Sequence, residues 1–334
     1  MAPFRRLALL CALCSSGPAI AATQYPLTVN NCGQSLPFAQ APQRVVTIGQ
    51  AGTELFYALG LGSRLVGTSL WFTPVQAQYA EQNAKVERLA DNDPSFEAVV
   101  GKRPQLVPVQ FEWMVGPQGV VGTREQFSAV GIPTYILPTD CEGKDNLVGA
   151  DGTRTEAFRL DSLYQGIDQL AQIFDVSARG EALVADYRQR IDKARAQAKA
   201  NHAERLSAVF WFSSADLELD PYVAGRQGVA DSMLRTLGMR NVIESNEEWP
   251  TVGWETIAKA NPSVLVIARM DRRRFPADDY QKKLEFLRND PVTRNMDAVR
   301  NGRILIMDAD AMQAGIRLIG GIEQLAEASA QFSR

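Results

Sequence analysis

A long run of helix-forming residues divides this chain into two halves, and it constrains the fold more than any other feature. Residues 178–200 contain mostly Ala, Leu, Arg, Gln and Lys, with no Gly or Pro after Gly180. Such a composition predicts one uninterrupted helix. At ~1.5 Å per residue it would extend roughly 30 Å, enough to bridge two lobes. A packed helix inside one domain is the alternative, but the pattern restarts at a strand after it, which favours the bridge.

Each half alternates short apolar runs with helical patterns. This alternation is typical of parallel sheets covered by helices. We expect strands at 45–48, 65–68, 105–109, 134–137, 207–212, 263–268 and 303–307, and helices at 53–59, 124–130, 158–174, 227–237, 254–260, 278–288 and 320–332. The predicted fold class is therefore α/β, with two Rossmann-like lobes joined by a single long interdomain helix.

A weak internal repeat supports two related lobes. Phe96-Glu97 is followed eight residues after the aromatic by Pro104 and an apolar run, and Trp254-Glu255 is followed in the same way by Pro262. In both halves an aromatic-Glu pair opens a short helix before a buried strand. The equivalent placement in each half indicates that the lobes share one design.

The N-terminus has the pattern of a secretory signal peptide. Arg5 and Arg6 give it a basic start, an apolar run continues to Leu13, and small residues lead to Ala21. A buried first helix or a membrane anchor is the alternative, but the run is shorter than the ~20 residues that span a bilayer. Bulky leucines precede Cys11 and Cys14, which disfavours lipoprotein cleavage, so we expect a soluble periplasmic protein. The expected organisation is a signal peptide at 1–21, an N-terminal lobe at 22–176, a linking helix at 177–202 and a C-terminal lobe at 203–334.

The charge and cysteine content of the expected mature chain narrow its partners. Removing Arg5 and Arg6 from 35 basic residues leaves 33 against 38 acidic ones, a net charge of −5. Nucleic acid as a partner usually requires a basic face, so we expect none. Cys32 and Cys141 remain, and in an oxidising compartment a disulfide between them is favoured over two free thiols. Two thiols and one histidine make a poor ligand set, so no metal site is expected.

The residue types that enzymes of this size require are scarce. His202 is the only histidine, which leaves little for a Ser-His-Asp mechanism or a histidine-rich zinc site. The sequence contains neither a phosphate loop nor a Gly-x-Gly-x-x-Gly after the first strand. A carboxylate-only hydrolase stays open, because acidic pairs are too common to be specific. We predict that the protein is not an enzyme and holds no cofactor.

The order of several short segments resembles that of siderophore- and cobalamin-type periplasmic binding proteins. The opening segments are Arg44-Val45-Val46-Thr47-Ile48-Gly49, Thr53-Glu54-Leu55 through Leu59-Gly60-Leu61, and Leu65-Val66-Gly67-Thr68. The similarity continues through Pro104-Gln105-Leu106-Val107, Leu237-Gly238-Met239-Arg240-Asn241-Val242, Trp254-Glu255, Asn261-Pro262-Ser263-Val264 and Val299-Arg300-Asn301-Gly302-Arg303. The resemblance covers nearly the whole expected mature chain.

The resemblance implies a monomer that binds its ligand in a cleft between two lobes and delivers it to the permease dimer of an ABC importer in the inner membrane. A branch of this family binds bare zinc or manganese with several histidines, and this chain departs from it. The sequence of this chain suits a ligand whose metal is already chelated. A ferric siderophore is the leading interpretation, and cobalamin, another corrinoid or haem is the alternative. A signalling or scaffold module without transport is an interpretation from a different class.

Ligands of doubly wound sheets bind beyond the carboxyl ends of the strands, and aromatic and arginine side chains recur there. For Trp71 and Trp211 the alternative is packing in the core, and for Arg124 it is a position on the surface. Arg269 is preferred over the nearby Arg272–Arg274. The candidate ligand-binding residues are Gln50, Trp71, Trp113, Arg124, Trp211, Arg269, Met312 and Arg317.

The repeat also supplies one glutamate for each lobe. In the resembling family, such a glutamate on each lobe pairs with arginines of the permease. The matching residues here are Glu97 and Glu255. A carboxylate in the first turn of a helix is also favoured by the helix dipole, which is the alternative explanation.

Overall fold

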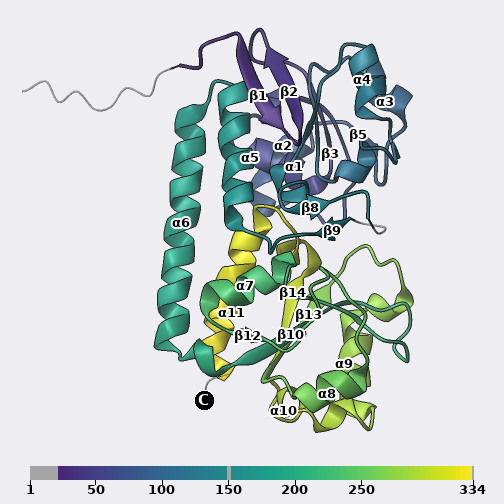
Figure 1. Cartoon of the computed structure of the whole chain (residues 1–334), viewed down its shortest axis with the longest axis vertical. Helices are drawn as coiled ribbons and strands as arrows, with labels where there is room; N and C mark the ends of the chain where they lie inside the picture. The colour runs from purple at the N-terminus through teal and green to yellow at the C-terminus, as the bar shows by residue number, and fades with distance from the viewer. Residues whose placement is uncertain (1–21, 149–151, 333–334) are drawn as a thin grey trace, which may run out of the picture.

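The computed structural model describes residues 22–148 and 152–332, so the expected signal peptide at 1–21 lies outside the described residues. Two α/β lobes lie one above the other, and α6 (Ser177–Ala200) runs along one side of both (Figure 1). The predicted fold class of two parallel-sheet lobes joined by a long helix is confirmed. The helix begins one residue before the predicted range and ends where predicted.

The N-terminal lobe contains a parallel sheet with the strand order β5-β4-β3-β6-β7. All four residues of β3 are buried, because helices cover both faces of the sheet. The order reverses between β3 and β6, and such switch points are where doubly wound sheets bind ligands. The strands are β3 (Val45–Ile48), β4 (Leu65–Ser69), β5 (Arg88–Ala90), β6 (Val107–Val109) and β7 (Thr134–Ile136).

The C-terminal lobe repeats this design around β10 (Ser207–Ser213). The strand β13 (Val264–Arg269) lies parallel beside β10, and β14 (Ile304–Asp308) lies parallel beside β13. On the other edge of β10, β11 (Tyr222–Val223) pairs antiparallel and β12 (Arg240–Asn241) pairs parallel. Both sheets therefore direct the carboxyl ends of their parallel strands into loops that can meet between the lobes.

The helices begin and end where local sequence favours it. Thr123 and Gln126 form a reciprocal capping box at the start of α4, and Gly238 ends α7 in the left-handed conformation. The N-lobe helices are α1 (Gln50–Ala58), α2 (Ala80–Asn83), α3 (Phe96–Gly101), α4 (Arg124–Ala129) and α5 (Leu160–Ile173). Those after α6 are α7 (Val229–Leu237), α8 (Trp254–Ala260), α9 (Tyr280–Asn289), α10 (Asp297–Arg300) and α11 (Arg317–Phe332). No helix in these described parts has the length and hydropathy to cross a membrane.

One apolar core continues from one lobe to the other through α6. Val184, Tyr187 and Ile191 of α6 belong to the same buried cluster as Leu170 of α5 and Leu325 of α11. Each lobe also has a separate cluster on the far face of its sheet. The helix is therefore part of a shared core and is more than a tether.

An N-terminal hairpin was not expected from the sequence. Its strands β1 (Leu27–Asn31) and β2 (Gln34–Phe38) are short and only half-buried, so their apolar pattern is weak. The side-chain amide of Asn31 bonds the backbone of Ile136 in β7, which attaches the hairpin to the N-terminal sheet. The structure contains the expected disulfide, which joins Cys32 at the hairpin turn to Cys141.

Candidate functional site

A large cleft lies between the two lobes. Its volume is about 1370 Å³, including space open to solvent. Loops that follow β4, β6 and β7 supply one wall, and the end of β10 together with loops that follow β12, β13 and β14 supplies the other. The cleft therefore lies at the carboxyl ends of both sheets, as expected for this class of fold.

Each lobe contributes a stacked aromatic pair to the cleft. Phe111 and Trp113 stack with ring centroids 5.7 Å apart and an interplanar angle of 18°. Phe212 and Trp249 stack at 4.4 Å and 29°. All four side chains are half-buried, so they keep apolar area available. Two flat apolar surfaces on opposite lobes suit a ligand with broad apolar faces.

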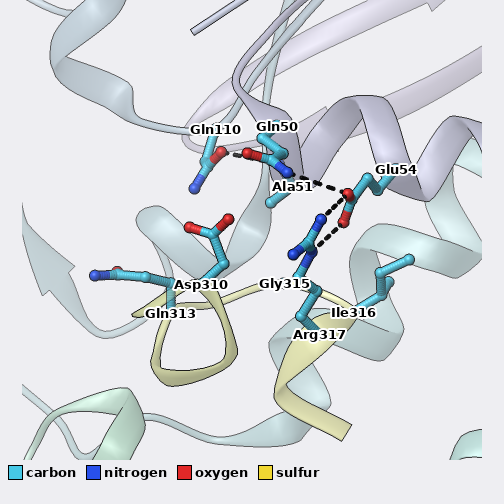
Figure 2. Close-up of a pocket in the computed structure, with 9 residues that line it drawn as sticks. All are labelled: Gln50, Ala51, Glu54, Gln110, Asp310, Gln313, Gly315, Ile316 and Arg317. Atoms are coloured by element: carbon cyan, nitrogen blue, oxygen red, sulfur yellow. Dashed lines mark hydrogen bonds and ion pairs between the residues drawn. The ribbon is translucent and has the colours of Figure 1, made fainter. Parts of the chain in front are cut away.

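A buried ion pair connects the lobes beside the N-terminal switch point. Figure 2 shows Glu54 of α1 facing Arg317 at the start of α11. The Arg317 Nε donates to Glu54 Oε2 at 2.8 Å, and an Arg317 Nη donates to the Pro74 carbonyl at 2.7 Å. The Glu54 side chain is 1% exposed. Gln50 and Gln76 also donate to its carboxylate, so the charge is compensated by several donors.

One corner of the cleft contains four charged side chains. Lys144 Nζ donates to Asp140 Oδ1 at 2.6 Å, and Arg154 Nε donates to Glu248 Oε2 across the lobes at 3.0 Å. Burial raises the pKa of Asp140, and the nearby Lys144 ammonium opposes that shift. We call Asp140, Lys144, Arg154 and Glu248 the charged corner.

The opposite rim also joins the lobes through polar contacts. Arg272, in the loop after β13, donates to the backbone carbonyls of Trp71 and Asp91 and to the side chain of Asn92. The hydroxyl of Thr73 donates to Asp310. These contacts close the cleft at that rim without using its aromatic walls.

Three of the predicted ligand-binding residues line the space between the lobes. Trp113 lines the large cleft, and Gln50 and Arg317 line the smaller pocket at its base. Gln50 is 3% exposed, and its amide bonds Glu54 and the backbone of Phe72 and Thr73. In this structure Gln50 therefore fixes the N-terminal wall internally, and Arg317 joins that wall to the C-terminal lobe.

Two predicted aromatic contacts are corrected by the structure. Trp71 is 1% exposed, and its indole N–H donates to Thr68. Trp211 is fully buried, donates to Ser214 and packs edge-on against Trp254. Their neighbours Phe72 and Phe212 line the cleft instead.

Three further residues that we predicted to bind the ligand also lie outside the cleft. Arg124 is 8% exposed and donates to carbonyls of Asn31, Cys32 and Thr134, where it supports the hairpin. Met312 is fully buried in the shared core. Arg269 is exposed and pairs with Asp308, and it does not line the cleft.

Lys144, Arg154 and Trp249 of the cleft were missed by the sequence analysis. Lys144 and Arg154 lie on the two-residue strands β8 (Lys144–Asp145) and β9 (Thr153–Arg154), which have no apolar pattern. Trp249 lies in a loop 12 residues after α7 ends. Its residue type could have indicated a cleft position. A large aromatic side chain between Glu248 and Pro250 is not part of an apolar pattern that would place it in the core.

The described residues offer no site for a bare metal ion. Within residues 22–148 and 152–332, no group of three His, Cys, Asp or Glu side chains is placed to hold one. His202 follows α6 and is exposed beside Glu204.

A family model described as periplasmic binding protein matches residues 45–311. This chain belongs to the periplasmic binding protein family. The match covers most of both lobes, and the members of the family are non-enzymatic binding proteins. The prediction from the resemblance is thus confirmed at the level of the family.

Individual relatives are distant but cover most of this binding protein. It is 23% identical over 305 residues to the uncharacterized ABC transporter substrate-binding lipoprotein YvrC of Bacillus subtilis, covering 91% of this chain and 85% of the relative. It is 24% identical over 230 residues to a vitamin B12-binding protein of Pectobacterium carotovorum, covering 68% and 71%. A solved Fe³⁺-hydroxamate transport protein of Saccharomonospora viridis superposes with a TM-score of 0.71 at 25% identity, covering 91% and 99%.

The buried pair between Glu54 and Arg317 yields a stability prediction. Arg317→Ala leaves the Glu54 carboxylate buried without its cation, and losing one partner of a buried pair costs about 3–5 kcal/mol. Arg269→Ala is the matched control, because exposed pairs contribute only about 0–1 kcal/mol. Urea unfolding measures both changes. Equal, small losses in the two variants would contradict the role assigned to Arg317.

Proposed function

We propose that this protein captures a bulky, weakly charged metal chelate in the periplasm and delivers it to an ABC importer, and that the chelate is a corrinoid. The observation that carries the proposal is the pair of aromatic stacks, Phe111–Trp113 and Phe212–Trp249, on opposite walls of the cleft. The cleft also offers room for a bulky ligand, with a volume of about 1370 Å³ that includes space open to solvent. The broad faces of a corrin ring fit between two such surfaces.

The charges in the cleft argue against a strongly anionic chelate. Four cationic and three acidic side chains line it, so they nearly balance. Lys144 is paired with Asp140, Arg154 with Glu248, and Arg272 with carbonyls of the other lobe. Most of the positive charge in the cleft is thus already engaged by the protein. A trianionic ferric catecholate would meet little uncompensated positive charge.

A ferric hydroxamate siderophore is the second candidate. Three hydroxamates neutralise Fe³⁺, so that chelate is uncharged and compatible with a nearly balanced cleft. The likeness to the Fe³⁺-hydroxamate transport protein of Saccharomonospora viridis supports it, as the likeness to the vitamin B12-binding protein supports the corrinoid. The wide, flat aromatic walls favour the corrinoid.

Haem fits less well. Haem iron in proteins is usually held by an axial His, Cys, Met or Tyr side chain. Among the residues that line the cleft, Met270 is the one side chain of these types. A chelate whose metal is already fully coordinated needs no such ligand.

The binding test uses tryptophan fluorescence. A cobalt corrinoid should quench the emission, and a ferric trihydroxamate should bind more weakly. Trp113→Ala and Trp249→Ala should each weaken corrinoid affinity about tenfold, or ~1.4 kcal/mol, through lost stacking area. Tyr222→Ala is the control, because Tyr222 is exposed outside the cleft. Saturable binding of free ferric ion, or tighter binding of the trihydroxamate, would refute the corrinoid assignment.

We further propose that Glu97 and Glu255 dock the protein to its permease. Glu97 lies in the first turn of α3 and Glu255 in the first turn of α8, and both are exposed. Neither carboxylate forms an ion pair with any described residue. The helices α3 and α8 precede β6 and β13, which lie beside the first strand of their respective sheets. Equivalent anchors on two similar lobes suit a permease dimer.

The docking proposal predicts that binding and transport separate. Glu97→Ala and Glu255→Ala should leave chelate affinity unchanged and weaken uptake, most strongly in the double variant. Glu244→Ala, an exposed glutamate of the C-terminal lobe, is the control. Ligand affinity is measured on purified protein and uptake in reconstituted importer. Normal transport by the double variant would show that these residues are not the anchors.

A further inference from the structure

The charged corner is buried far more deeply than a surface pair. The exposed fractions of the side chains are 7% for Asp140, 5% for Lys144, 2% for Arg154 and 17% for Glu248. Removing four charges from water is costly, and apolar residues would often be at least as stable in their place. The corner also lines the ligand cleft. Its position points to a role in ligand recognition.

The corner retains donors that the protein does not use. A lysine ammonium has three N–H donors, and among the described residues Lys144 Nζ bonds only Asp140. Arg154 donates from Nε to Glu248 and from Nη2 to the Thr139 carbonyl, which leaves Nη1 without a hydrogen-bond acceptor in the described parts of the chain. Donors in a nearly dry corner gain most from a ligand acceptor.

The corner also retains an acceptor. Arg154 occupies Oε2 of Glu248, while Oε1 has no hydrogen-bond donor among the described residues. The corner as a whole carries two positive and two negative charges. It therefore presents donors and an acceptor side by side with no net charge to attract an anion.

A primary amide matches this arrangement better than a carboxylate. An amide both accepts through its oxygen and donates through its nitrogen, so it can use Lys144 or Arg154 together with Glu248. A carboxylate can only accept, so it leaves Oε1 of Glu248 without a donor and close to a like charge, and the balanced corner offers its own charge no net attraction. Glu248 thus favours a chelate with an amide rim and disfavours one with a carboxylate rim. Specific sites commonly combine attraction of one ligand with repulsion of another in this way.

We propose that the charged corner selects chelates whose rim carries primary amides over chelates whose rim carries carboxylates, with Glu248 as the residue that discriminates. This inference rests on the proposed function, in which the chelate lies between the two aromatic stacks. It places amide-rimmed corrinoids among the ligands and carboxylate-rimmed chelates, porphyrins with propionates included, outside them.

The test compares three cobalt corrinoids with one ring and different rims: amides, methyl esters or free carboxylates. Affinities are measured at neutral pH by tryptophan quenching. The wild-type protein should bind the amide form most tightly, the ester next and the carboxylate at least tenfold more weakly than the amide. The ester lacks both the charge and the N–H donors, so it separates repulsion from lost hydrogen bonding.

Glu248→Gln should narrow the preference of the amide form over the carboxylate form, because the amide side chain removes the repelling charge. Glu244→Gln, on the exposed surface of the same lobe, is its control. A carboxylate form that binds the wild type as tightly as the ester or the amide overturns the inference and leaves the proposed function standing. If none of the three corrinoids binds, the proposed function fails, and the inference fails with it. The wild-type series decides the matter even if the Glu248→Gln variant does not fold.

Discussion

The shared apolar core around α6 is the constraint on which the rest of this structure depends. Val184, Tyr187 and Ile191 pack in one cluster with α5 above and α11 below, so the lobes cannot move freely about the helix. Close-packed interiors resist deformation, because shifted side chains lose their contacts. The cleft is consequently a largely preformed surface, lined by an aromatic stack from each lobe before a ligand arrives.

Polar contacts complete this frame at the edges that the apolar core does not reach. The pair of Glu54 and Arg317 fixes α1 against α11 at the base, Arg154 and Glu248 connect the lobes at one corner, and Arg272 reaches across the opposite rim. Removing one partner of a buried pair is costly, whereas replacing the whole pair by apolar residues is often neutral, so such pairs fix geometry without adding much net stability. A family with many ligands can thus keep one frame and change the side chains that face the cleft.

The sequence predicted the frame well because long-range periodicity is robust. The long helix, the parallel strands and the related lobes follow from patterns spread over many residues, which a local irregularity does not erase. The short strand pairs β1–β2 and β8–β9 were not predicted, because strands of two to five half-buried residues show little alternation of apolar and polar side chains. The charged corner could not be anticipated, since it combines β9 with a loop 94 residues away.

At three places the predicted ligand-binding residue is buried, and the residue that follows it in the sequence lines the cleft. Trp71, Trp211 and Met312 are buried, while Phe72, Phe212 and Gln313 next to them line the cleft. At Trp211 and Phe212 the reason is strand alternation, because successive side chains of β10 point to opposite faces and a correct strand still leaves two candidates. We predicted the tryptophans because of their large aromatic area, but the structure buries both of them in the core. At Leu70 a positive φ turns the chain just before Trp71, which no propensity indicates.

The most direct test of this account is a crystal structure of the protein purified from the cells that produce it, with anomalous data collected at the cobalt and iron edges. The account predicts one cobalt peak between the stack of Phe111 and Trp113 and the stack of Phe212 and Trp249, with the metal coordinated by its chelate alone. A metal ion bound directly by protein side chains, or a ligand outside the interlobe cleft, would contradict it.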